Sequence, residues 1–128
     1  MPLRSSQDVV RARQRVRDIA VGMGFSLVEQ TKLVTAASEL ARNTIEYGRG
    51  GDMTIERIDA PGVPGIRLVF SDQGPGIPDI ELALRDGYTT GGGLGMGLGG
   101  ARRLVSEMTI DSTPGAGTRI TVTKWKRA

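Results

Sequence analysis

An acid and an amide stand four residues apart within a helix-like stretch, Ser-Glu-Leu-Ala-Arg-Asn. These residues are Glu39 and Asn43, and Glu46 follows one helical turn later. Residues four apart share one face of a helix. A carboxylate can take the proton of a hydroxyl group or water, and an amide oxygen suits a hard cation such as Mg²⁺. The spacing therefore indicates metal-assisted proton transfer, while an ordinary solvated helix face would carry the same residues.

A second candidate site follows an apolar run, where Asp72 precedes the turn Gly74-Pro75-Gly76. This order predicts a carboxylate at a strand end, beside a backbone that a flat ligand can approach. The carboxylate could accept a hydrogen bond from an exocyclic amine such as that of adenine. The alternative is a plain tight turn, because Asp, Pro and Gly are common turn residues.

The third candidate is a glycine-rich segment, since seven of the ten residues 91–100 are glycine. It leads into a predicted helix, and backbone N–H groups at such a place can bind phosphate oxygens. Gly95, Gly97 and Gly100 match G-x-G-x-x-G, but no apolar strand precedes them and no Walker A lysine follows. Phosphate binding and a flexible loop with a helix-packing glycine are the two interpretations.

Composition limits the remaining chemistry. The 128 residues, 38% hydrophobic and 24% charged, indicate one globular domain, residues 1–128. The net charge of +3 is too small to indicate nucleic acid binding. The chain has no Cys and no His, which excludes thiolate nucleophiles, Cys-bound metal and phosphohistidine. No apolar run is long enough for a membrane span, so we expect a cytoplasmic protein without membrane partners.

Hydrophobic periodicity predicts the elements that must position these motifs. Helices are expected at residues 5–21, 26–47 and 98–106, with a short one within 79–85. Strands are expected at residues 53–59, 66–72, 108–112 and 118–125. Hairpins followed by helices indicate an α+β fold, with helices on one face of a mixed, mainly antiparallel sheet.

The three motifs, in this order and followed by Gly117-Thr118, resemble the N, G1, G2 and final boxes of the GHKL (Bergerat) ATP-binding fold. The stretches SELARN, DQGPGIPDI and GGLG resemble the RsbT-type serine/threonine switch kinases of that superfamily. The resemblance implies a two-layer α/β sandwich. That family usually opens with a strand before the first helix. Only four residues precede Ser5 here, so the strand is very short or the sheet has one strand fewer.

The resemblance also implies a role for each motif residue. Asn43 would ligate Mg²⁺, and Glu39 would act as the base that orients the attacking hydroxyl. Asp72 would bind the adenine amino group, with Gly76 behind the ring and Thr118 helping through its hydroxyl. The remaining ATP contacts would be Gly74, Gly92, Gly93, Leu94, Gly95, Met96, Gly97 and Leu98. Residues 79–92 would form the ATP lid.

The function implied by the resemblance is ATP-dependent phosphorylation of serine or threonine in STAS-domain regulators of a bacterial stress-signalling assembly, the stressosome. Partner switching follows, because the released kinase would activate a PP2C-type phosphatase. Two alternatives stay open: an anti-sigma factor kinase that sequesters a sigma factor directly, and a non-catalytic, nucleotide-gated interaction module.

Four arginines stand at alternate positions in the first predicted helix: Arg11, Arg13, Arg15 and Arg17. They are either solvated flanks of the apolar stripe or a docking surface for an acidic partner.

Overall fold

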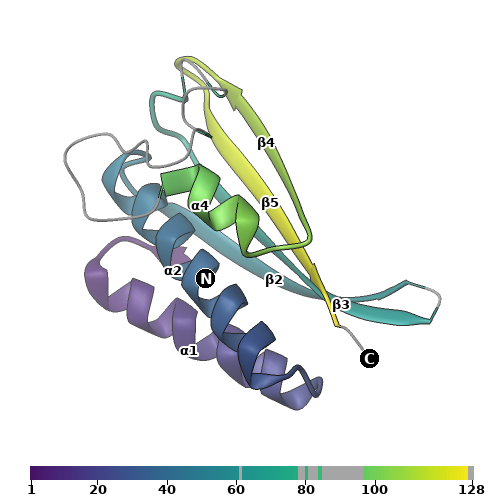
Figure 1. The fold of residues 1–128 in the computed structure, drawn as a ribbon. Coiled ribbons are helices and arrows are strands. Elements are labelled where there is room, and N and C mark those ends of the chain that lie inside the picture. The colour runs from purple at the N-terminus through teal and green to yellow at the C-terminus, as the bar shows by residue number, and fades with distance from the viewer. Residues whose placement is uncertain (61, 78–79, 81–83, 85–96, 127–128) are drawn as a thin grey trace.

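A computed structural model describes residues 1–60, 62–77, 80, 84 and 97–126. Its elements follow one another along the chain as β1 (Pro2–Leu3), α1 (Ser6–Gly22), α2 (Leu27–Glu46), β2 (Gly51–Ala60), β3 (Val63–Asp72), α4 (Gly97–Arg103), β4 (Glu107–Thr113) and β5 (Gly117–Trp125) (Figure 1). None of these described helices combines the length and the apolar character needed to cross a bilayer.

Both long helices begin at the predicted serines. The Asp8 carboxylate accepts hydrogen bonds from the backbone N–H groups of Arg4 at 2.9 Å and Ser5 at 3.2 Å. These bonds, that of Arg4 above all, lower the pKa of Asp8. At the start of α2, the Ser26 hydroxyl accepts from the Glu29 N–H at 3.2 Å, and the Glu29 carboxylate accepts from the Ser26 N–H at 3.4 Å. Side chains thus satisfy N–H groups that a helix leaves unpaired at its start.

The sheet has the strand order β1-β2-β3-β5-β4, and every described pair is antiparallel. The sequence predicts a mixed, mainly antiparallel sheet, and no parallel pair is present among the described strands. The β4–β5 hairpin folds back so that β5 lies between β3 and β4, which run in the same direction and are not neighbours. The predicted strand before the first helix is present as β1, two residues long and paired with the start of β2.

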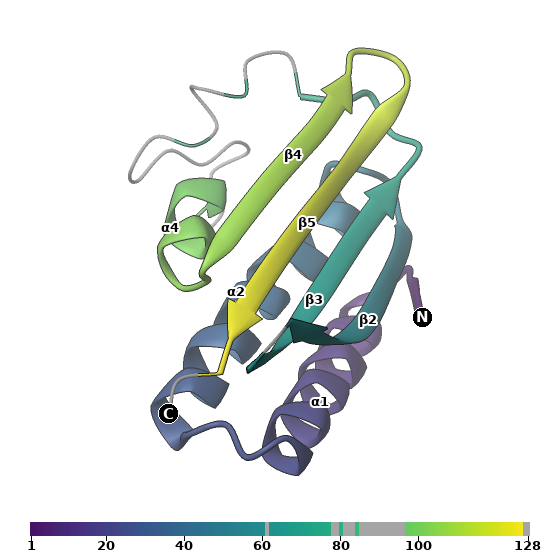
Figure 2. The ribbon, with the colours of Figure 1, turned by 90° about the vertical axis from the view of Figure 1, so that its right-hand side faces the viewer.

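The described helices lie together on one face of the sheet (Figure 2). Small residues of α1 let it approach α2 closely, and larger side chains of α2 and the central strands fill the space over the sheet. Burying each large apolar side chain contributes about 1.5–3 kcal/mol to stability. The most deeply buried large residues are Leu3, Val16, Leu33, Leu40, Met53, Ile66, Leu68, Phe70 and Val122.

Two predicted elements differ from the structure. α4 ends at Arg103 rather than near residue 106. The reason is that the Ser106 N–H donates to the Thr123 carbonyl at 2.9 Å, which draws the chain into the sheet before β4 begins. The short helix predicted within residues 79–85 lies mostly outside the described residues. Of that segment, the Leu84 N–H donates to the Ile80 carbonyl at 3.0 Å, the spacing of one helical turn.

The turn between β4 and β5 is in close contact with the loop that follows β3. The Gly115 N–H donates to the Pro75 carbonyl at 2.7 Å. Gly117 has a φ of +95°, and a Cβ there would overlap the Asp72 carbonyl oxygen. The close approach of these two backbone segments therefore depends on a residue without a side chain at position 117.

Gly117→Ala should destabilise the fold more than Gly115→Ala. Both glycines have positive φ, +95° and +83°, but a Cβ at Gly115 would meet no atom within 4 Å. Gly115→Ala should lose only the backbone contribution, about 1–3 kcal/mol. Gly117→Ala should lose the same backbone contribution to stability. In addition, its new Cβ should push the turn away from Asp72, which destabilises the fold further. Urea unfolding midpoints measure both losses, and equal losses would contradict the close contact.

Candidate functional site

The acid and amide of the first motif lie in the last two turns of α2. Glu39 is buried, with 7% of the residue exposed, and Asn43 is half-buried, whereas Glu46 is exposed. The Glu39 carboxylate lies 3.7 Å from the Arg42 guanidinium, which is itself half-exposed. A buried carboxylate requires polar partners. The interpretation of this motif as a solvated helix face is therefore wrong for Glu39.

The end of α2 is in direct contact with the loop after β3. The N–H groups of Tyr47 and Gly48 donate to the Asn43 carbonyl at 2.9 and 3.3 Å, so the chain turns immediately after the helix. Gly48 then lies against the side chain of Asp72, with no room for a Cβ between them. A Cβ on Gly74 would lie 2.7 Å from the Gly48 Cα. The structure thus brings the Glu39–Asn43 motif and the Asp72 motif together.

The contact of Gly48 with Asp72 was not predicted from the sequence. Three glycines near one helix end (Gly48, Gly50 and Gly51) exceed what a helix stop requires. The additional glycines indicate a place where two backbone segments come close together. They are the feature of the sequence from which this contact could be predicted.

Asp72 ends β3, where its carboxylate is half-buried. Its Oδ1 accepts from the Gly74 N–H at 2.9 Å, which closes a tight turn. Among the described residues, this is the one hydrogen bond that the Asp72 side chain accepts. Oδ2 accepts no hydrogen bond from the described residues and lies on the side of Gly48.

Asp72 is the first of three side chains that lie next to one another on adjacent strands of the sheet. Thr118 of β5 is paired with Asp72 on one side and with Ser112 of β4 on the other, so the three share one face. Thr118 is 8% exposed, and its hydroxyl oxygen lies 2.9 Å from that of Ser112. Ser112 also accepts from the Ile77 N–H at 2.7 Å. Thr118 is one of the predicted site residues, whereas Ser112 is not, although the alternation of β4 places it on the same inner face.

The third motif is described only at its end. Gly97 and Leu98 are both buried at the start of α4, and Gly97 has a φ of +71°. Leu98 belongs to the same core cluster as Leu40 and Ala41 of α2, so the glycine-rich segment ends beside the helix of the first motif. Of the predicted phosphate contacts, Gly92, Gly93, Leu94, Gly95 and Met96 lie outside the described residues, as does most of the predicted lid.

The donors at this site suit a magnesium ion that arrives with a nucleotide. Magnesium in phosphoryl-transfer sites is held by one or two protein oxygens and by substrate phosphates. The described part of the chain contains no group of three His, Cys, Asp or Glu that could hold a metal ion. Asn43 supplies an amide oxygen, and the phosphates would supply further ligands.

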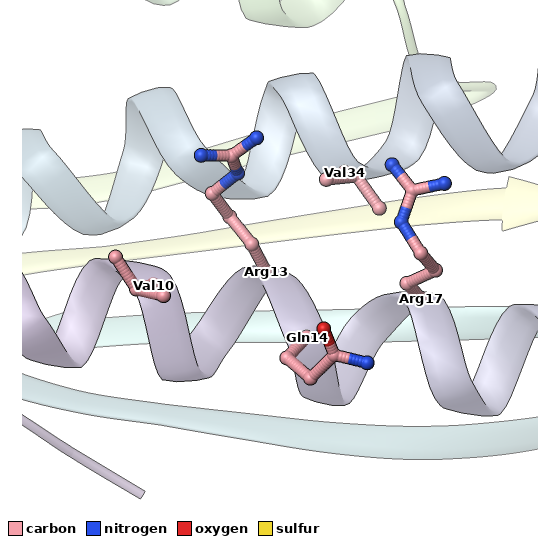
Figure 3. A pocket seen from close by; sticks show the side chains of 5 residues that line it. All are labelled: Val10, Arg13, Gln14, Arg17 and Val34. Atoms are coloured by element: carbon pink, nitrogen blue, oxygen red, sulfur yellow. The ribbon is translucent and has the colours of Figure 1, made fainter.

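A separate groove of about 220 Å³ lies between α1 and α2. Val10, Arg13, Gln14 and Arg17 line it from α1, and Val34 lines it from α2 (Figure 3). At 1.5 Å per residue, Val34 stands about 13 Å along α2 from Asn43. The groove is therefore distinct from the site at the end of that helix.

Comparisons with known proteins show the family to which the chain is similar. Residues 28–128 match the family model for the histidine kinase-, DNA gyrase B-, and HSP90-like ATPase. The serine/threonine-protein kinase RsbT of Bacillus subtilis (strain 168) is 46% identical over 94% of this chain and 90% of that protein. An anti-sigma F factor of Thermoanaerobacter sp. (strain X514) is 32% identical over 96% of this chain and 89% of that protein.

A solved structure shares the fold at low sequence identity. The mycobacterial sensor histidine kinase MprB superposes with a TM-score of 0.60 at 20% identity, covering 99% of this chain and 97% of that one.

The helix-borne acid and amide, the aspartate-tipped strand and the two sequence matches agree, and the chain belongs to the histidine kinase-, DNA gyrase B- and HSP90-like ATPase family and, within it, to the RsbT-like serine/threonine-protein kinases.

Proposed function

We propose that this kinase transfers the γ-phosphoryl group of Mg²⁺-bound ATP to a serine or threonine of STAS-domain regulators in a bacterial partner-switching pathway. The observation that carries the proposal is the contact of Gly48 with Asp72, which unites the Glu39–Asn43 helix end with the Asp72 loop. The match to RsbT over nearly the whole chain supports the same chemistry.

The adenine base would bind at the row formed by Asp72 and Thr118. The free Oδ2 of Asp72 accepts from the exocyclic amine, and Thr118 adds a hydroxyl contact from the adjacent strand. Gly74 and Gly76 let this loop pack closely against Gly48 and the Thr113 carbonyl, which fixes the loop beside Asp72. A carboxylate can accept from the exocyclic amine of either purine, so the group beside the amine would decide between adenine and guanine.

The phosphates would extend from this row toward the glycine-rich residues 92–98, with Asn43 holding the magnesium ion beside them. The bound ion would neutralise phosphate charge. Asn43 presents its amide oxygen from the last turn of α2, one turn beyond Glu39. Gly97 and Leu98 come from α4, which packs against α2.

Phosphoryl transfer would then need little beyond positioning and one proton acceptor. The hydroxyl oxygen of the substrate forms a bond to the γ-phosphorus as the bond from phosphorus to the ADP oxygen breaks. The hydroxyl proton passes to the carboxylate of Glu39. Its buried position keeps this carboxylate away from bulk water, and the nearby Arg42 guanidinium compensates its charge.

Partner proteins would dock in the groove between α1 and α2. Arg13 and Arg17 place two positive charges there, and neither has an ion pair among the described residues. Arg11, by contrast, is paired with Asp8 at 3.1 Å. Val10 beside them is 62% exposed. Positive charge next to exposed apolar surface suits an acidic, partly apolar segment of a STAS-domain protein or of a PP2C-type phosphatase in the cytoplasm.

The match to anti-sigma F factors favours one alternative, in which the groove binds a sigma factor directly. Pull-down of this chain with a STAS-domain protein and with a sigma factor separates the two. A purely non-catalytic binding module is disfavoured, because burying the Glu39 carboxylate costs stability that a binding role alone would not require.

Glu39→Gln should abolish phosphoryl transfer without preventing ATP binding. Removing a positioned base lowers the rate by about 10²–10⁴-fold. Phosphorylation of a STAS-domain protein, followed by phosphosite mapping, measures the rate. Glu46→Gln is the matched control, since it makes the same change at an exposed position two turns later on the same helix. Unchanged transfer by Glu39→Gln would refute the catalytic role.

Asn43→Ala should weaken ATP binding only when magnesium is present. The side chain is the proposed ligand, while the backbone carbonyl that accepts from Tyr47 and Gly48 is kept. Losing one contact to a charged group costs about 1.5–3 kcal/mol, or roughly a 10- to 150-fold change in Kd. Calorimetry with and without Mg²⁺ measures the difference. Equal weakening in both conditions would point to a structural role.

Arg13→Glu should weaken binding of the partner by at least about tenfold, because it places a negative charge opposite an acidic segment. Arg15→Glu is the matched control, since Arg15 is exposed on the same helix and does not line the groove. Titration of each variant with a STAS-domain protein gives the Kd values. The same loss in both variants would mean that net charge, rather than the groove, governs docking.

A further inference from the structure

Ser112 joins three parts of the proposed adenine site. It lies on β4, one strand beyond Thr118, and its hydroxyl contacts the loop, the turn and Thr118 at once. We infer that Ser112 is a positioning and specificity residue for the purine base, acting through the hydroxyl of Thr118. This inference rests on the proposed binding of adenine by Asp72 and Thr118.

The number of protons in this cluster limits what Thr118 can do. A serine hydroxyl has one proton to donate and two lone pairs. Ser112 uses one lone pair to accept from the Ile77 N–H at 2.7 Å. Its single proton can go either to the Gly117 carbonyl, 3.2 Å away, or to the Thr118 hydroxyl, 2.9 Å away.

These two arrangements give Thr118 opposite chemistry. If Ser112 donates to Gly117, then Thr118 donates to Ser112 and offers a ligand only lone pairs. If Ser112 donates to Thr118, the proton of Thr118 is free for an acceptor on the ligand. Adenine presents a ring nitrogen acceptor beside its amine, while the ring nitrogen between the amine and the carbonyl group of guanine carries a proton and is a donor. With Asp72 accepting from the amine, the second arrangement complements adenine.

Ser112 also holds the loop that carries the glycines of the second motif. The loop is attached to the β4–β5 hairpin at two points, through the Pro75 carbonyl to Gly115 at 2.7 Å and through the Ile77 N–H to Ser112. Removing the Ser112 hydroxyl leaves the first attachment in place. The fold should therefore survive, while the Ile77 N–H loses its acceptor and Thr118 loses its proton donor.

Ser112→Ala should raise the KM for ATP about tenfold, which corresponds to 1.4 kcal/mol, and leave kcat at saturating ATP unchanged. The affinity for GTP should change little, so the preference for ATP over GTP falls. Ser106→Ala is the matched control, because its hydroxyl accepts from the Trp125 N–H at 3.0 Å at the opposite end of the same hairpin. Ser112→Cys keeps a weak donor and should fall between wild type and Ser112→Ala.

A double-mutant cycle tests whether Ser112 acts through Thr118. If it does, Ser112→Ala combined with Thr118→Val should bind ATP no more weakly than the weaker single variant. Independent, additive losses would overturn the inference, as would an unchanged preference for ATP in Ser112→Ala and Ser112→Cys.

Asp72→Asn separates failure of this inference from failure of the proposed adenine site. If Asp72→Asn abolishes the preference for ATP while Ser112→Ala keeps it, the role of Ser112 is refuted and the adenine site stands. If Asp72→Asn leaves the preference unchanged, the adenine assignment and the role of Ser112 both fall.

Discussion

The site depends on one steric constraint, the contact of backbone with backbone around Asp72. Gly48 from the end of α2, Gly74 from the loop and Gly117 from the β4–β5 turn all lie where a Cβ would collide with Asp72 or with each other. Three chain segments, far apart in sequence, can meet because these residues have no side chains.

The rest of the fold serves to make this approach rigid. α2 is held at its start by the reciprocal bonds of Ser26 and Glu29 and along its length by core residues such as Leu33 and Leu40. β3 and β5 pair over eight residues, which sets Thr118 beside Asp72. A helix and two strands with little freedom thus carry polar side chains on their ends, an arrangement that preserves geometry better than loops can.

Local patterns were sufficient to predict most of the fold and part of the site. The serines at the helix starts, the apolar stripe of α2 and the twofold alternation of the strands are signals within a single segment, and the structure confirms them. The neighbours of Asp72 are different. The contact of Gly48 with Asp72 and the bond of Ser112 to Ile77 join residues that are 24 and 35 positions apart. No periodicity spans such distances.

Contacts between distant segments also explain where the end of α4 and the burial of Glu39 differ from the predictions. The end of α4 depends on a hydrogen bond from Ser106 to Thr123, which only the assembled sheet provides. The burial of Glu39 likewise arises in the folded chain, whereas the helix pattern alone allowed a solvated face.

The insertion of β5 between β3 and β4 has a consequence for how the chain folds. Thr118 lies beside Asp72 only when the final hairpin is docked in the middle of the sheet, so the proposed nucleotide site exists only in the completed sheet. A nucleotide that recognises this pocket binds the completed fold and not its precursors. By mass action it then stabilises the native state, and the cellular nucleotide pool becomes a folding ligand for the chain.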